Sequence, residues 1–307
     1  MKDRIVVGSR GSKLALLQAQ DVVDQLKTAN PRLHFELKAI KTAGDIDRKT
    51  SLQVQGGKGI FVKEIEEALL RYDIDIAVHS LKDMPTEIAS GLRLATVTQR
   101  LDPRDVFVSA RGVRLSKLPP GSRIGTGSQR RAVQLMNCRQ DIVATDMRGN
   151  IDTRLSKCFC GEVDGIMLAA AALIRMKLDD RITEYLPADT FVPAVGQGAL
   201  GIEIRDNDSA MNELVAQLNH KQSWLAVTAE RAFLKALGGG CREPIAALGI
   251  VKGSSLELRG MVANSATHEA MYADVRGSAA SSEQLGVKLA RGMMRMGADV
   301  LLGRQDA

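Results

Sequence analysis

Residues 79–83 (HSLKD) combine side chains that suit acid–base and ion-pair chemistry. They follow residues 74–78, a short β-branched run with alternating apolar positions that predicts a buried strand. Charged groups beside a core are costly unless they are paired or used, and ligands bind beyond the carboxyl ends of strands in open α/β sheets. The pattern marks Lys82 and Asp83 as candidate functional residues. The alternative is an ordinary strand-end loop in water.

Residues 8–13 (GSRGSK) predict a strand-to-helix turn that can bind an anion. Backbone N–H groups at a helix start attract negative charge, and Arg10 and Ser12 add side-chain donors. The spacing is not that of a P-loop. Ser12 is also a common helix N-cap residue, and the two roles are compatible.

Residues 125–131 (GTGSQRR) predict a second turn of this kind. Arg130 and Arg131 oppose the helix dipole unless an anion lies nearby. Adjacent helical residues point about 100° apart, so we expect the two arginines to reach separate carboxylates. The alternative is that both arginines are solvated on the surface. This alternative is disfavoured because Thr126 and Ser128 add donors to the same turn.

A third turn, residues 147–154 (MRGNIDTR), carries Arg148 and Arg154, and Arg175 follows the next predicted strand. The arginines at predicted strand ends, or in the helices that follow, are Arg10, Arg130, Arg131, Arg148, Arg154 and Arg175. Such a set predicts a cleft for a ligand with several carboxylates or phosphates.

Cys241 follows three glycines, which expose its thiol on a turn, and Arg242 favours the reactive thiolate. The alternative is a small buried hydrophobic residue. Cys158 and Cys160 lack the spacing of a zinc site, so we expect both to be structural and expect no metal.

The elements that position these residues alternate between strand and helix, which predicts mostly parallel sheets. Predicted strands lie at residues 4–7, 33–39, 74–78, 92–98, 123–126, 142–145, 165–168 and 200–204. Predicted helices lie at residues 15–26, 61–72, 128–138, 150–160, 170–177, 208–218 and 222–237, with a long loop at 41–59. After residue 245 the pattern changes to three strands (245–251, 256–263, 269–276) and one helix (282–302), which indicates an antiparallel α+β unit.

These patterns predict three domains, as expected for 307 residues. Domain 1 comprises residues 1–98 plus 199–217, domain 2 residues 104–193, and domain 3 residues 221–307. The predicted fold is two periplasmic-binding-protein-like α/β domains around a cleft, plus a small C-terminal α+β domain with a three-stranded antiparallel sheet.

The composition limits the partners. The net charge of +6 and a pI near 9.2 favour anionic ligands. Scattered arginines and only 3% aromatic residues argue against nucleic acid. We expect no membrane partner, because no apolar run approaches the roughly 18 residues of a membrane span. The absence of a signal peptide and four cysteines read as thiols predict a cytoplasmic protein.

Six motifs in register resemble the porphobilinogen deaminase (hydroxymethylbilane synthase) family, and the resemblance extends over essentially the whole chain. They are residues 56–64 (GGKGIFVKE), 79–85 (HSLKDMP), 125–131 (GTGSQRR), 148–154 (RGNIDTR), 193–198 (PAVGQG) and 239–241 (GGC).

The resemblance implies a monomeric transferase of haem biosynthesis with a dipyrromethane cofactor joined to Cys241 by a thioether. It would join four porphobilinogen molecules head to tail, release ammonia each time, and then hydrolyse off the linear tetrapyrrole hydroxymethylbilane. Asp83 matches the catalytic aspartate. The implied cofactor contacts are Lys82, Asp83, Thr126, Ser128, Arg130, Arg131, Gly149 and Arg154. The implied substrate contacts are Arg10, Ser12, Lys58, Arg148, Arg154 and Arg175.

Asp83 suits this chemistry because a fixed carboxylate stabilises positive charge that develops on pyrrole nitrogens. It can also shuttle protons. An aspartate among arginines stays ionised, however, which leaves the proton donor unassigned. Two other classes remain open, a two-lobed anion receptor and a basic nucleic-acid module.

Overall fold

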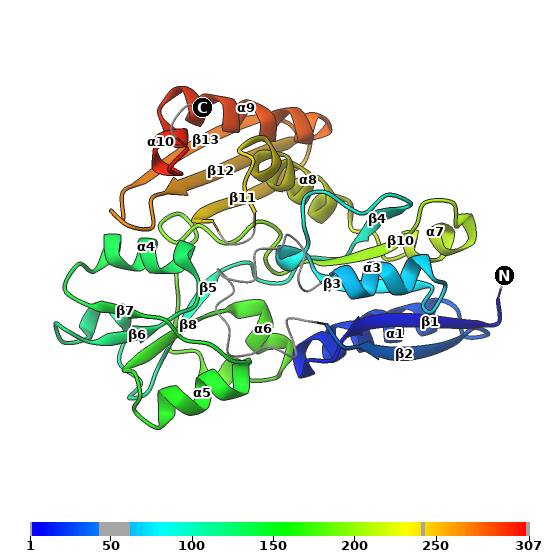
Figure 1. Cartoon of the computed structure of the whole chain (residues 1–307), viewed down its shortest axis with the longest axis horizontal. Coiled ribbons are helices and arrows are strands. Elements are labelled where there is room, and N and C mark those ends of the chain that lie inside the picture. The colour runs from blue at the N-terminus through cyan, green and yellow to red at the C-terminus, as the bar shows by residue number, and fades with distance from the viewer. Residues whose placement is uncertain (1, 43–61, 241–242, 305–307) are drawn as a thin grey trace. The chain divides into compact units, whose positions relative to one another are not determined.

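The computed structural model describes residues 2–42, 62–240 and 243–304. The chain divides into two compact units, which we call unit 1 (Met1–Leu101 with Ala199–Trp224) and unit 2 (Asp102–Gly198 with Leu225–Ala307). Unit 2 holds two of the three sheets, and the division into three domains stays a prediction. Figure 1 labels the elements.

The sheet of unit 1 has five strands in the order β2-β1-β3-β10-β4. β1 pairs in parallel with β2 and β3, whereas β10 pairs antiparallel with β3 and β4. The prediction that residues 200–204 return to this sheet is confirmed, but the sheet is mixed. The strands are β1 (Arg4–Arg10), β2 (His34–Ile40), β3 (Ile76–Ser80), β4 (Leu92–Val97) and β10 (Leu200–Arg205).

Helices cover both faces of this sheet because side chains alternate along its strands. Val22 and Leu26 of α1 (Lys13–Ala29) pack with Ile76 and Val78 on one face. On the other face, α3 (Lys63–Leu70) packs against Ala77. Among the described residues of this unit, a further helix is α7 (Ser209–Ala216).

Strand β3 ends two residues later than the sequence predicts. His79 and Ser80 continue the ladder, opposite Gly201 and Leu200. A single 3-10 turn, η1 (Leu81–Asp83), follows at once. Asp83 therefore occupies the end of this turn. The predicted loop at 41–59 lies almost entirely outside the described residues.

The first sheet of unit 2 has the order β7-β6-β8-β5-β9. β6 pairs in parallel with β7 and β8, and β5 pairs antiparallel with β8 and β9. β5 and β9 were absent from the sequence prediction. The elements are β5 (Asp105–Ser109), β6 (Arg123–Gly125), β7 (Val143–Thr145), β8 (Gly165–Ala169), β9 (Glu184–Tyr185), α4 (Gln129–Cys138), α5 (Ile151–Phe159) and α6 (Ala170–Arg175).

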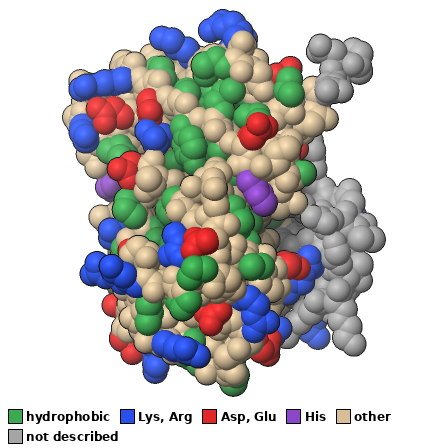
Figure 2. Space-filling view, turned by 90° about the vertical axis from the view of Figure 1, so that its left-hand side faces the viewer, with side chains coloured by type: hydrophobic (Ala, Val, Ile, Leu, Met, Phe, Trp, Pro, Cys, Tyr) green, Lys and Arg blue, Asp and Glu red, His purple; other side chains and the backbone are tan. Residues whose placement is uncertain are grey.

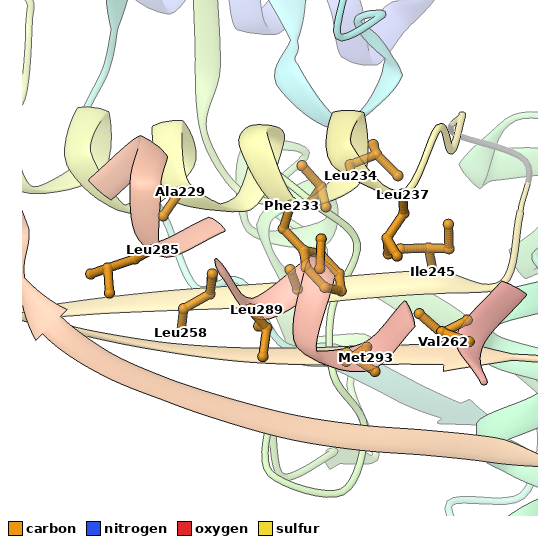
Figure 3. Close-up of a cluster of buried hydrophobic side chains, with 14 of the residues drawn as sticks. Ala229, Phe233, Leu234, Leu237, Ile245, Leu258, Val262, Leu285, Leu289 and Met293 are labelled. Atoms are coloured by element: carbon orange, nitrogen blue, oxygen red, sulfur yellow. The ribbon is translucent and has the colours of Figure 1, made fainter. Parts of the chain in front are cut away.

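The second sheet of unit 2 is antiparallel in the order β11-β12-β13, which confirms the predicted C-terminal α+β unit. Helices α8 and α9 pack their apolar side chains over its strands around Phe233 and Leu289 (Figure 3). The predicted single helix at 282–302 is broken at Gly297, whose φ of 93° requires glycine. The elements are α8 (Lys221–Ala236), β11 (Ile245–Lys252), β12 (Ser255–Ala263), β13 (Ala270–Ser278), α9 (Ser282–Arg295) and α10 (Ala298–Leu301).

The surface charge is mixed on the face that Figure 2 shows, where basic and acidic side chains are interspersed with hydrophobic ones. Among the described helices, none is long and apolar enough to cross a membrane.

Candidate functional site

A pocket in unit 1 brings together residues from the first two candidate motifs. It lies where β1 and β3 end and α1 begins, with a volume of about 420 Å³ that includes space open to solvent. Arg10 and Ser12 enter it from the first turn, and Asp83 from the second. The other lining residues are Leu14, Ala15, Gln18, Val62, Val78, His79 and Ser80.

Asp83 has an available carboxylate on an anchored turn. The residue is half-buried, and no described residue makes a hydrogen bond or ion pair with its carboxylate. The side chains of Leu81 and Met84 are buried, 1% and 3% exposed, and anchor the turn to the apolar core. Gly201 leaves room for the Leu81 side chain, because a Cβ at position 201 would lie 2.6 Å from Cδ1 of Leu81. The turn is therefore held by apolar packing while the carboxylate stays accessible.

Ser12 is an N-cap, one of its two predicted roles: its Oγ accepts a hydrogen bond from the Ala15 N–H at 3.3 Å. Arg10 is the last residue of β1 and is half-buried. Lys82 is half-buried within η1.

Arg130 and Arg131 share one carboxylate, that of Asp105. Arg130 Nη1 donates to Asp105 Oδ2 at 2.6 Å, and Arg131 Nη2 donates to Oδ1 at 2.8 Å. The shared contact arises because β5 places a buried acid beside the first turn of α4, and the prediction that the two arginines reach separate ligand carboxylates stays a prediction. Sequence reasoning missed Asp105, although the apolar run at 106–108 that follows it is a strand signal.

Partners within the protein take several of the hydrogen bonds of this cluster. Burial alone would raise the pKa of Asp105, but Arg130 and Arg131 together hold that pKa well below its usual 3.8. Both guanidinium groups also donate to backbone carbonyls, of Val192 and Met167. The three charged residues form a structural ion-pair cluster at the base of the turn.

The two candidate turns of unit 2, residues 125–131 and 147–154, pack closely together. A Cβ on Gly127 would lie 2.9 Å from the carbonyl oxygen of Met147. Gly149 has a φ of 114°, and its carbonyl accepts a hydrogen bond from Arg154 Nε at 2.8 Å. Asn150 caps α5 by accepting from the Thr153 N–H at 2.9 Å.

Hydroxyl groups lie at the start of α4. Ser128 caps this helix by accepting a weak hydrogen bond from the Arg131 N–H at 3.4 Å. Thr126 Oγ1 accepts from the Ser128 N–H at 3.2 Å.

Arg154 is a cation in strongly positive surroundings. Burial lowers its pKa to about 10; Arg131 and Arg148 also lower this pKa, and only Asp146 opposes them. Its one hydrogen bond to a described residue goes to the Gly149 carbonyl, with no carboxylate at ion-pair distance. Arg148 is more exposed and lies 3.3 Å from Asp146.

The remaining candidates are Arg175, Lys58 and Cys241. Arg175 Nη2 donates to the Gly198 carbonyl at 3.0 Å. Lys58 and Cys241 lie outside the described residues. The structure thus assembles one group in unit 1 (Arg10, Ser12, Lys82, Asp83) and one in unit 2 (Thr126, Ser128, Arg131, Arg148, Gly149, Arg154).

The group in unit 2 fits an acidic cofactor. Arg154 is a partly buried cation with arginine neighbours, and no carboxylate of the described residues lies at ion-pair distance from it. Carboxylates on a bound pyrrole cofactor would supply the missing negative charge, and the hydroxyl groups at the start of α4 can add hydrogen bonds.

An α/β protein whose strand ends carry arginines, hydroxyl groups and one available carboxylate is suited to the chemistry of small acidic molecules. Two family models match the chain, "Porphobilinogen deaminase, dipyromethane cofactor binding domain" over residues 5–213 and "Porphobilinogen deaminase, C-terminal domain" over residues 224–295. The chain belongs to the porphobilinogen deaminase family. The predicted enzyme class, transferase function in porphyrin biosynthesis and dipyrromethane cofactor are confirmed at this level.

Curated relatives match along nearly their whole length. A porphobilinogen deaminase of Thermus thermophilus is 46% identical over 98% of this chain and 98% of its own. One of Geobacter sulfurreducens is 45% identical over 98% of this chain and 94% of its own.

Among solved structures, a putative methionine-binding lipoprotein of Bacillus subtilis has a TM-score of 0.44 at 12% identity, over 71% of this chain and 90% of its own. The BenM effector binding domain has a TM-score of 0.41 at 14% identity, over 70% of this chain and 90% of its own.

Replacing Arg154 by methionine is expected to weaken binding without lowering the stability of the protein. Loss of a partly desolvated cation should stabilise the cofactor-free protein slightly, by up to about 1 kcal/mol. Loss of a carboxylate contact with the cofactor or the elongating product should lower kcat/KM for porphobilinogen roughly 30-fold, the equivalent of about 2 kcal/mol. Thermal unfolding of the cofactor-free protein and initial rates of the holoenzyme measure the two effects.

The matched control is Arg123→Met, an exposed arginine on β6. An unchanged kcat/KM in Arg154→Met would place this guanidinium outside the binding site.

Proposed function

We propose that the pocket of unit 1 is where porphobilinogen reacts, with Asp83 as the catalytic residue. The observation that carries this proposal is the convergence of Arg10, Ser12 and the available Asp83 carboxylate on one pocket. Arg10 binds a substrate carboxylate, and Ser12 adds a donor while it caps α1. Asp83 accepts hydrogen bonds from pyrrole N–H groups and stabilises their developing positive charge.

The group in unit 2 holds the cofactor and the elongating product. The positive surroundings of Arg154, together with the hydroxyl groups of Thr126 and Ser128, support this role. Arg148 and Arg175 contact carboxylates of the elongating product. Arg130 and Arg131 act mainly by shaping the turn, because Asp105 already occupies both guanidinium groups.

Lys58 and Cys241 take their roles from the family pattern in GGKGIFVKE and GGC. Cys241 carries the cofactor through its sulfur, Lys82 contacts that cofactor, and Lys58 binds a substrate carboxylate. When bound, the dipyrromethane supplies the pyrrole α-carbon from which the product grows.

The protein works as a monomer in the cytoplasm. Exposed thiols at Cys138 and Cys160 suit a compartment that keeps thiols reduced. Sedimentation equilibrium at several concentrations tests the monomer, since a rising average mass would contradict it.

Intact mass spectrometry of the purified protein tests the cofactor assignment. We expect a mass above that of the bare polypeptide by one dipyrromethane, located by peptide mapping to the segment with Cys241. Cys241→Ser should fold with the mass of the polypeptide alone. A bare wild-type mass would favour the anion receptor, and a cofactor retained in Cys241→Ser would overturn the attachment site.

A further inference from the structure

A histidine and a glutamate form a buried pair beside the pocket of unit 1. His79 Nε2 lies 2.9 Å from Glu203 Oε2, and the two residues are 6% and 0% exposed. His79 also lines the pocket that contains Asp83 and Arg10. A titratable ring thus connects the pocket to a fully buried acid.

The pair is fixed by sheet geometry. Glu203 on β10 is the register partner of Ala77 on β3, and His79 lies two residues further along β3. All three side chains therefore point to the face that α3 covers. Nε2 is held by Glu203, and the other ring nitrogen, Nδ1, has no hydrogen bond to a described residue.

Glu203 is a strong source of negative potential. Its Oε1 is buried and has no hydrogen-bond partner among the described residues. Burial raises the pKa of Glu66 on α3, the charge of Glu203 raises it further, and His79 opposes both effects. The hydrogen bond to Glu203 therefore holds the His79 ring in one orientation beside the pocket.

We propose that His79, oriented by Glu203, is the proton-transfer residue of this site. The inference rests on the proposed function of the pocket and deepens it, because Asp83 stabilises charge while His79 moves the proton. This arrangement follows a common catalytic logic, in which an acid orients the imidazole and stabilises its cationic form.

The transfer balances in protons and electrons. Porphobilinogen enters with its aminomethyl group as the ammonium, and the C–N bond breaks with both electrons on nitrogen, which frees neutral ammonia within the pocket. After the new C–C bond has formed, a pyrrole α-carbon loses its proton to neutral His79 Nδ1, and the C–H electron pair returns to the ring. His79 then gives the proton to ammonia, which departs as ammonium, and no outside reactant is needed.

The test compares holoenzymes of wild type, His79→Gln and Glu203→Gln with porphobilinogen that carries deuterium at its free α-carbon. We expect His79→Gln to lower kcat about 100-fold. It should also raise the primary isotope effect and abolish the low-pH limb of the rate profile. Glu203→Gln should lower kcat about tenfold. The charged groups around His79 are Glu203 on β10, Glu66 on α3, and Arg10 and Asp83 in the pocket.

A second measurement is independent of turnover. In Asp83→Asn holoenzyme, the imidazole ¹⁵N signals of His79, assigned by their loss in His79→Gln, should shift when porphobilinogen is added. Cofactor content by mass should be unchanged in His79→Gln. If this variant does not fold, His79→Gln/Glu203→Gln keeps a hydrogen-bonded pair of amides and carries the same kinetic expectation.

The control is His34→Gln, an exposed histidine on β2, which should match wild type. The inference is overturned if His79→Gln shows the kcat, isotope effect and pH profile of this control, or if the ¹⁵N signals do not move. A wild-type protein without cofactor or porphobilinogen turnover would instead refute the proposed function itself.

Discussion

Replacing Asp83 by asparagine is expected to lower kcat about 1,000-fold and to leave the covalent cofactor in place. The amide has the shape of the carboxylate but lacks the charge that stabilises cationic pyrrole nitrogens. Folding should be little affected, because no described residue pairs with this carboxylate and the turn is anchored by Leu81 and Met84. The variant therefore tests chemistry separately from stability.

Single-turnover release of ammonia, with cofactor content by intact mass, measures this effect. Asp21→Asn, an exposed acid on α1, is the matched control and should behave as wild type. A kcat within threefold of wild type in Asp83→Asn would remove Asp83 from its proposed role.

The largest loss of stability is expected for Asp105→Asn, about 3–5 kcal/mol in the free energy of unfolding. Asp105 is fully buried between Arg130 and Arg131, so the substitution leaves two buried guanidinium groups without their counter-charge. Urea unfolding followed by circular dichroism measures this change in the free energy of unfolding. Asp141→Asn removes a similar bridge, to Arg139 on the surface, and should change the midpoint little.

The same carboxylate predicts how stability depends on pH. Its pKa in the folded protein lies below the usual 3.8, because the two arginines outweigh the effect of burial. Its contribution is therefore present above about pH 4 and is lost as the pH falls through the folded-state pKa. Wild-type stability should decline below pH 4, and the decline should be shallower in Asp105→Asn. Parallel declines would show that other carboxylates dominate acid unfolding.

The sequence was informative wherever a pattern is local. Alternating apolar residues located β3, and the polar run after it located Asp83. A capping signal gave the start of α1 at Ser12, and the structure adds side-chain caps at Ser128 and Asn150 for α4 and α5. These features depend on neighbours within four residues, so the chain itself carries the signal.

Sequence patterns did not predict contacts between residues that lie far apart in the chain. The acid shared by Arg130 and Arg131 was missed because it lies 25 and 26 positions earlier, in a strand that was not predicted. His79 was read as part of a polar loop, whereas pairing with β10 adds it to the sheet and places Glu203 beside it, 124 positions away. Such contacts depend on topology, which single-sequence patterns do not specify.

The late position of β10 in the chain has a consequence for biosynthesis. This strand separates β3 from β4 in the sheet of unit 1, yet it is made only after residues 102–198 have left the ribosome. Until then the nascent chain presents two unpaired strand edges, which are sites for misassociation. His79 also lacks Glu203 during this interval. The pocket can therefore mature only after about two thirds of the polypeptide has been translated, and chaperone protection is most valuable to the nascent chain before that point.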